Sequence, residues 1–372
     1  MPNAALVLED DSSWIGEPFG ADVPAEGEIV FNTSMSGYQE IATDASYAGQ
    51  MVVLTHPQVG NYGVSASASE SSRPWIQALI VRDLSPAYHH WEARESLHAF
   101  LRRNDIPGIS GVDTRALVKK LRARGALRAV LRQKKTEWTS AELKALADEA
   151  RSVVSLSDRP LVAGSSGFVE ADPGLEIASA PRIAVVDCGA KANIVRSLER
   201  RGTRITLLPW DASIGDVLTL APDGVLLTNG PGDPARLPSL VRLASELLER
   251  RMPLFGICLG HQVMGQAAGS TTSRLPYGHH GGNHPVQEVE TGRVTVTTQN
   301  HEFQVDRSPA LEANGFRVSH VNLNDGSVEG LEHRELPAFS LQYHPEGCPG
   351  PQDSQPIFDR FLQVAVARRE QP

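Results

Sequence analysis

The stretch "LFGICLGHQ", residues 254–262, decides the fold of the second half of this 372-residue chain. It passes from an apolar, strand-like run into Cys258, which stands between Gly256 and Gly260. Gly-Ile-Cys-Leu-Gly matches a G-x-nucleophile-x-G pattern, in which small flanking residues allow a sharp turn from strand to helix. Such a turn exposes the sulfur at a helix N-terminus, where unpaired N–H groups favour the thiolate. The alternative is a buried cysteine that acts as a small hydrophobe.

Strand and helix patterns alternate on both sides of this stretch. "RIAVVDCG", which begins at Arg182, is a continuous apolar run typical of a strand buried on both faces. An amphipathic helix is indicated by one apolar stripe, made by Leu240, Leu243, Ala244, Leu247 and Leu248. The alternation predicts an α/β fold with a mostly parallel sheet flanked by helices. Reactive groups in such sheets gather beyond the carboxyl ends of the strands, which is where Cys258 falls.

The first part of the chain has a different pattern. Short β patterns such as "GEIVFNTSMSG" and "QMVVLTHP" are separated by turn residues and followed by helical pieces. They predict a separate, β-rich α+β domain over residues 1–150. Residues 151–180 lose strong periodicity and gain Ser, Gly, Pro and acidic residues, as linkers do. Residues 181–372 then form the second domain, and the chain length agrees with two or three domains.

Composition argues against several kinds of protein. The net charge is −9 and no basic block occurs, so we expect no nucleic-acid partner. No apolar run approaches the ~20 residues of a membrane helix, and the first residues lack a signal-peptide pattern. The three cysteines are widely spaced and imply no disulfide framework, which favours a reducing, cytoplasmic setting. We expect Cys188 in the core and Cys348 in a Gly/Pro loop, with nothing to activate it.

Two further motifs complement the cysteine. In "LQYHPE", His344 and Glu346 are two residues apart on an extended segment and therefore point to the same side. The carboxylate can hold one ring nitrogen while the other faces a thiol, although the tripeptide alone also fits a surface turn. "TNGPGDP" follows another predicted strand, and its glycines let main-chain N–H groups approach a substrate. An oxyanion site needs two donors, and the N–H groups of Gly230 and Leu259 are the natural pair.

These motifs resemble those of a known family. "GICLGHQ", "NGPGDP" and "HPE", within one alternating α/β domain, resemble the class I (Cys-His-Glu) glutamine amidotransferases. "FNTSMSGYQEIATDASY", "YGHHGGNHPV" and "QNHEFQVD" resemble the small, glutamine-hydrolysing subunits of carbamoyl-phosphate synthetases. The likeness covers nearly the whole chain, and its N-terminal portion separates these subunits from other amidotransferases.

The resemblance implies a mechanism and a set of substrate contacts. Cys258 would attack the side-chain amide of L-glutamine, His344 would accept and then return a proton, and Glu346 would orient His344. A thioester would form and be hydrolysed to glutamate, with the oxyanions held by the N–H groups of Gly230 and Leu259. The family's glutamine contacts, carried over by position, fall on Ser46, Gly230, Gly232, Leu259, Gln262, Asn300, Glu302 and Phe303. Ser46 belongs to the first domain, so we expect the pocket to lie between the domains.

Some residues depart from the family's pattern or stand out for other reasons. The family usually has glycine at position 302 and often a small residue at position 343, where this chain has Glu302 and Tyr343. Backbone contacts at residue 302 could survive, but a positive φ there would cost energy. The histidines of "GHHGGNH" lack a recognised zinc-ligand pattern, so we expect glycine-rich packing and no metal. Lys191, at the start of a predicted helix, is expected to face solvent.

The resemblance also implies a partner. A large synthetase subunit would complete a heterodimer, bind ATP, Mg and bicarbonate, and receive ammonia to make carbamoyl phosphate for arginine and pyrimidine biosynthesis. This chain contains neither G-x-x-x-x-G-K-[ST] nor G-x-G-x-x-G, so we expect no cofactor on it. The alternatives are a glutaminase subunit of a different synthase, a γ-glutamyl hydrolase, or a non-catalytic scaffold or regulatory subunit. "FNTSMSGYQEIATD" argues against the first two, and the complete set of Cys258, His344 and Glu346 argues against the last.

Overall fold

The computed structural model describes residues 3–171 and 179–369, and the chain divides into two compact units. The first consists of Met1–Arg159 and Pro276–His280, and the second of Pro160–Leu275 and Gly281–Pro372. Residues 172–178 of the predicted linker lie outside the described residues. No helix in the described ranges is both long and apolar enough to cross a membrane.

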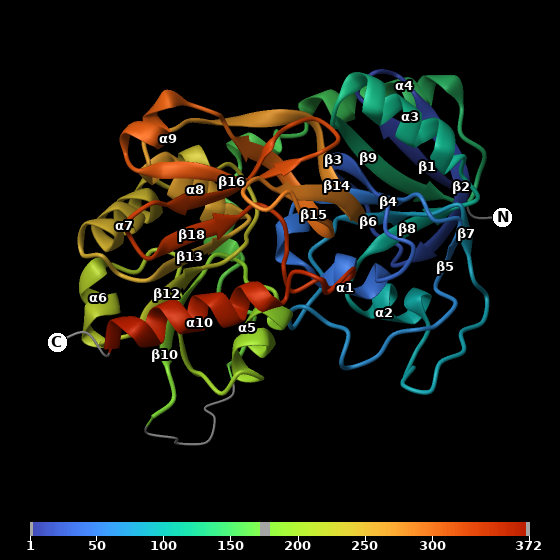
Figure 1. Cartoon of the computed structure of the whole chain (residues 1–372). Coiled ribbons are helices and arrows are strands. Elements are labelled where there is room, and N and C mark those ends of the chain that lie inside the picture. The colour runs from blue at the N-terminus through green and yellow to red at the C-terminus, as the bar shows by residue number, and fades with distance from the viewer. Residues whose placement is uncertain (1–2, 172–178, 370–372) are drawn as a thin grey trace. The chain divides into compact units, whose positions relative to one another are not determined.

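The first unit is built on a closed barrel of seven strands in the order β1-β2-β8-β6-β4-β3-β9 (Figure 1). Alternate residues of a strand join different apolar clusters, because successive side chains point to opposite faces. Ile29 and Met51 pack in the cluster that contains residues of α3, whereas Val30 and Val52 pack with residues of α1 and α2. The predicted β-rich α+β unit is confirmed. Its elements are β1 (Asn3–Leu8), β2 (Ser13–Gly20), β3 (Ala25–Asn32), α1 (Tyr38–Thr43), η1 (Ala45–Tyr47), β4 (Gln50–Leu54), β5 (Gln58–Val59), β6 (Ala78–Ile80), β7 (Asp83–Leu84), α2 (Leu97–Arg103), β8 (Pro107–Ser110), α3 (Thr114–Arg124), β9 (Leu127–Lys134) and α4 (Ser140–Ser152).

The second unit contains a nine-stranded sheet in the order β11-β10-β12-β13-β18-β17-β15-β14-β16. The predicted parallel part is present, since β11, β10, β12, β13 and β18 pair in parallel. The remaining four strands pair antiparallel, a half of the sheet that the sequence pattern did not predict. The strands are β10 (Arg182–Asp187), β11 (Arg204–Pro209), β12 (Gly224–Leu227), β13 (Leu254–Ile257), β14 (Thr272–Glu288), β15 (Val294–Val305), β16 (Phe316–Asn322), β17 (Val328–His333) and β18 (Ala338–Leu341).

Helices cover both faces of the parallel strands, which explains their continuous apolar sequences (Figure 1). Ala184 and Val186 of β10 pack in the cluster with α7 and α8, whereas Ile183 and Val185 pack with α5 and α10. The first unit ends with the helical turn η2 (Leu156–Asp158). The helices and helical turns of the second unit are η3 (Val162–Gly164), α5 (Ala192–Glu199), α6 (Ile214–Thr219), η4 (Pro234–Arg236), α7 (Pro238–Glu249), α8 (Leu259–Ala267), α9 (Pro309–Ala313) and α10 (Pro356–Arg369). Because β12, β13 and β18 are neighbours in the sheet, the three motifs that follow them meet at one edge.

Candidate active site

The turn between β13 and α8 has the backbone of a nucleophile elbow. Cys258 has φ 54° and ψ −101°, a conformation that residues with a side chain rarely adopt. A Cβ added to Gly256 would lie 2.7 Å from the carbonyl carbon and oxygen of Gly260, and one added to Gly260 would lie 2.2 Å from Leu227 O. Both flanking positions therefore need glycine, because their neighbours are backbone atoms that cannot move aside.

Cys258 contacts two other strands of the sheet, through its sulfur and through its N–H group. The residue is buried, and its Sγ lies 3.6 Å from the carbonyl oxygen of Asn300 on β15. Its own N–H donates to Leu341 O at the end of β18, over 2.8 Å. Leu259 is the first residue of α8, so its N–H has no acceptor within the helix. A Cβ on Gly230 would lie 2.9 Å from Leu259 Cδ2, which places the two expected oxyanion donors on neighbouring residues.

The histidine and glutamate form a hydrogen-bonded pair beside this cysteine. His344 Nδ1 lies 2.7 Å from Glu346 Oε1, and both side chains are fully buried. The N–H of His344 donates to Thr298 O of β15 over 2.8 Å, which fixes the backbone of the segment after β18. His344 Nε2 has no hydrogen-bond partner among the described residues. Cys258 lies close enough to this ring to help raise its pKa.

Lys191 joins the buried pair of His344 and Glu346. The expectation that Lys191 faces solvent is wrong. Its side chain is 2% exposed, and its Nζ lies 2.9 Å from Glu346 Oε1. The same ammonium group donates to the carbonyl oxygen of Cys348. The Lys191 N–H donates to Asn229 Oδ1 over 3.1 Å, so the lysine is held by the loop after β12. Glu346 thus bridges a lysine and the histidine.

The charges of this group shift both protonation equilibria. Burial raises the pKa of Glu346, but the charges of Lys191 and His344 outweigh burial and hold it at about 2. Burial lowers the pKa of His344, but Glu346 and then Cys258 outweigh it and raise the pKa to about 10. The lowered pKa of Glu346 makes its full contribution to stability above the ordinary carboxyl pKa, about 4.5. The raised pKa of His344 makes its full contribution below the ordinary histidine pKa, about 6.5. The pair therefore contributes most between these limits, and its contribution falls toward pH 2 and pH 10.

The residues expected to contact glutamine occupy several elements. Gln262 on α8 donates from Nε2 to Phe303 O over 2.8 Å and to Gln342 Oε1 over 3.2 Å, which ties the helix to β15. Asn300 and Phe303 are buried on β15, and Gly232 has φ 92° in the loop after β12. Ser46 lies in η1 of the first unit, where its N–H donates to Asp44 Oδ1 over 2.9 Å.

The two departures from the family's pattern have simple structural explanations. Glu302 is not among the residues with positive φ, so the backbone does not require glycine there. Its carboxylate Oε2 lies 3.2 Å from Arg274 Nη2 on β14, and the side chain is 5% exposed. Tyr343 points away from the neighbouring His344 and packs in the apolar cluster with α5 and α10. Burial raises the pKa of Tyr343, so its hydroxyl stays protonated.

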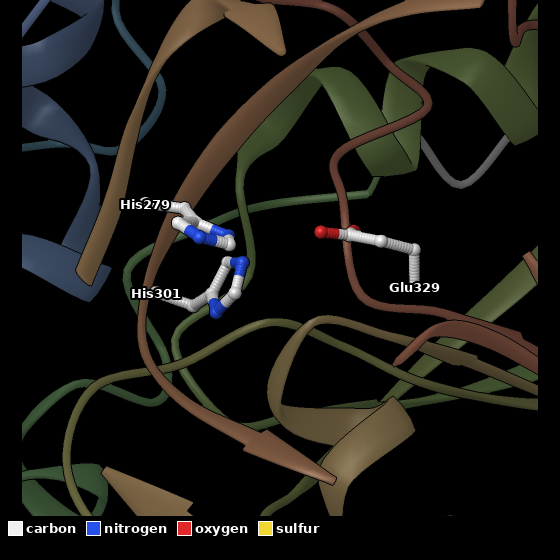
Figure 2. A group of neighbouring side chains, drawn as sticks. All are labelled: His279, His301 and Glu329. Carbon is white, nitrogen blue, oxygen red and sulfur yellow. The ribbon is translucent and has the colours of Figure 1, made fainter. Parts of the chain in front are cut away.

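Figure 2 shows His301 and Glu329 of the second unit, drawn together with His279 of the first. Hydrogen bonds already use the polar atoms of His301 and Glu329. The ring nitrogens of His301 lie 2.7 Å from Phe303 O and 2.9 Å from Gln299 Oε1. The oxygens of Glu329 accept from Gln299 Nε2 and Asn322 Nδ2, both over 2.9 Å. This pair therefore forms part of an amide network rather than an open set of metal ligands.

The other cysteines differ from Cys258 in their surroundings. Cys188 is buried after β10, and burial together with Asp187 raises the pKa of its thiol, as expected for a core residue. Cys348 is half-buried, and its Sγ lies 3.5 Å from Glu346 O.

Comparisons with known proteins identify the family of the chain. The chain matches the family model "Glutamine amidotransferase class-I" over residues 184–364 and "Carbamoyl-phosphate synthase small chain, CPSase domain" over residues 6–131. The carbamoyl phosphate synthase small chain of Symbiobacterium thermophilum is 46% identical, over 96% of this chain and 97% of the relative. That of Aquifex aeolicus is 41% identical, over 97% and 98%. The carbamoyl phosphate synthase pyrimidine-specific small chain of Lactiplantibacillus plantarum is 42% identical, over 98% and 96%.

Fold and site together define a class I glutamine amidotransferase, with a cysteine elbow at the edge of an α/β sheet and a His-Glu pair beside it. The first unit shows which amidotransferase subfamily this is, because residues 6–131 match the CPSase domain of the carbamoyl-phosphate synthase small chain. The chain belongs to the family of carbamoyl phosphate synthase small chains, the glutamine-hydrolysing subunits of that enzyme.

Proposed function

We propose that this chain hydrolyses L-glutamine to glutamate through a thioester on Cys258 and passes the ammonia to a large synthetase subunit. The observation that carries the proposal is the buried group of Cys258, His344 and Glu346 at the carboxyl edge of the sheet. The raised pKa of His344 keeps its ring protonated at neutral pH, and the positive ring stabilises negative charge on the adjacent sulfur. The same proton is then available for the leaving ammonia.

The other site residues have separate parts in this proposal. The N–H groups of Gly230 and Leu259 stabilise the oxyanion of each tetrahedral intermediate. Gln262, Asn300 and Phe303, with the main chain at Gly232, hold the glutamine. Glu346 orients the ring of His344 and stabilises its charged form, as its 2.7 Å hydrogen bond supports. Ser46 completes the glutamine site from the first domain.

The partner and the pathway form the finer part of the proposal. The large subunit binds ATP, Mg and bicarbonate, and no cofactor binds to this chain. The carbamoyl phosphate serves arginine and pyrimidine biosynthesis in the cytoplasm. The test is ammonia release from glutamine by the purified chain, measured with and without the large subunit. We expect release in both cases and faster turnover in the complex, whereas a chain that releases no ammonia in either case would contradict the proposal.

A substitution at Glu302 tests whether its side chain binds glutamine. Because the carboxylate already pairs with Arg274, we expect Glu302 to lend only its backbone to the substrate. Glu302→Gln and Glu302→Gly should therefore each change the KM for glutamine by less than about threefold. Both lose the pair with Arg274, which lowers stability, and Glu302→Gly adds a backbone-entropy cost of ~1 kcal/mol to folding. Steady-state kinetics of the complex give the KM values. A rise of about tenfold or more in both variants would instead make Glu302 a substrate ligand through a charge-assisted contact.

A further inference from the structure

A groove rich in arginine lies at the opposite ends of the strands from Cys258. Its volume is about 560 Å³, and five arginines line it: Arg250, Arg251, Arg334, Arg360 and Arg368. Arg250 and Arg251 lie between α7 and β13, and Arg334 lies between β17 and β18. The groove is therefore at the amino ends of β13 and β18, whereas Cys258 and His344 follow the carboxyl ends of the same strands. We refer to it as the arginine groove.

The positive charge of the arginine groove is only partly neutralised. Two carboxylates also line it, but Glu332 is already bonded to Arg360 and to Arg317. Within residues 3–171 and 179–369, no carboxylate lies within 4.0 Å of the guanidinium groups of Arg250, Arg251 or Arg334. The chain as a whole carries a net charge of −9, whereas the arginine groove has more guanidinium groups than carboxylates. The local charge of the groove is therefore opposite in sign to that of the whole chain.

Arg251 occupies a backbone position where an arginine is unfavourable for folding. It has φ 53° and follows the last turn of α7. Its N–H donates to Leu248 O over 2.9 Å, and the N–H of Met252 donates to Leu247 O over 3.0 Å, the pattern of a Schellman motif. Glycine is the usual residue at this position, because a side chain is strained at positive φ. The backbone conformation at the end of α7 therefore does not explain why an arginine is present at position 251.

We propose that the arginine groove binds a small molecule that carries a diphosphate group. Guanidinium groups pair with phosphate oxygens through two parallel hydrogen bonds, and they lose less hydration than an ammonium when they do so. Three guanidinium groups without a carboxylate partner match the several oxygens and charges of two linked phosphates better than a single monovalent anion. The volume also lies within the roughly 300–1,000 Å³ of small-molecule sites. The proposal is independent of glutamine hydrolysis, since it concerns the other end of the strands.

The test is a calorimetric titration of the full chain with inorganic pyrophosphate at low ionic strength. We expect saturable binding that weakens as salt is added. Arg251→Gly should weaken this binding by about tenfold or more, through loss of a charge-assisted contact. Its melting temperature should stay the same or rise, because glycine suits the left-handed conformation. A weakening accompanied by unchanged stability separates a ligand contact from damage to the fold.

Two further variants complete the experiment. Arg334→Gln should weaken pyrophosphate binding by a similar factor without touching the helix end. Arg242→Gln is the matched control, since it removes one charge from an exposed position of the same helix α7, outside the groove. It should change the affinity by less than about twofold. The proposal is overturned if wild type shows no saturable pyrophosphate binding, if Arg242→Gln weakens binding as much as Arg251→Gly, or if orthophosphate binds as tightly as pyrophosphate.

Discussion

Replacing Cys258 by serine is expected to abolish the synthesis of carbamoyl phosphate from glutamine, while synthesis from free ammonia by the assembled enzyme persists. Serine keeps the size of the side chain and should fit the same backbone turn. Its hydroxyl, however, is a far poorer nucleophile than a thiolate beside an imidazolium. The glutamine-dependent rate should fall by at least about a thousandfold, the scale seen when a nucleophile is removed.

The two reactions should be measured on the same preparation of the complex, with either glutamine or ammonium chloride as the nitrogen source. Cys348→Ser is a suitable control, because its thiol lies beside the Glu346 carbonyl oxygen and has no part in the proposed chemistry. That variant should keep most of the glutamine-dependent rate. Loss of the ammonia-dependent reaction in a correctly assembled Cys258→Ser complex would contradict the proposed division of work between the subunits.

Replacing Lys191 by methionine is expected to destabilise the second unit strongly. Methionine fills the same space but leaves Glu346 buried beside His344 without its main positive neighbour. Removing one partner of a buried ion pair costs about 3–5 kcal/mol, since the other charge remains buried. The loss should be largest at neutral pH. The loss should shrink as pH falls below about 4.5, because Glu346 is then protonated in the unfolded chain. Folding of the variant then no longer has to bury an unpaired carboxylate.

Urea unfolding at several pH values measures this difference in the free energy of unfolding. The double variant Lys191→Met with Glu346→Gln should recover part of the stability, because the buried carboxylate is then gone. Lys134→Met is the matched control: Lys134 pairs with Glu142 near the surface of the first unit, and such pairs contribute about 1 kcal/mol or less. Equal losses from Lys191→Met and Lys134→Met would show that the Lys191 pair is not buried in solution.

The sequence predicts the parallel half of the second unit well, because strands covered on both faces have continuous apolar runs. Ile183, Val185, Ala184 and Val186 pack alternately on two helical layers, so no polar position interrupts the run. The antiparallel half could not be predicted in the same way. Long strands such as β14 (Thr272–Glu288) carry many Gly, His and polar residues, which resemble a loop until their partners in the sheet are known.

Some residues of the candidate site could likewise be predicted from short motifs, whereas others depend on contacts with distant parts of the chain. The elbow and the His-Glu pair follow local rules of spacing, so Cys258, His344 and Glu346 were predicted from short motifs. Lys191 was placed wrongly because its burial depends on Glu346, 155 positions further along the chain. A lysine four residues after the carboxyl end of a buried strand, as Lys191 is after Asp187, is a usable signal, since that edge of the sheet collects functional groups. The amide network around His301 has no comparable local signal.

Strand β15 contacts both reacting partners, and this has a consequence for how the chain can vary. The carbonyl of Thr298 holds the backbone of His344, and the carbonyl of Asn300 faces the sulfur of Cys258. The two carbonyls are separated by one repeat of an extended chain, roughly 7 Å. A single inserted or deleted residue between them would turn one of these carbonyls toward the opposite side of the strand within the sheet, because successive carbonyls of a strand point in opposite directions. Homologous chains should therefore differ here in residue type but never in length, and loop grafts for engineering should leave residues 298–300 intact.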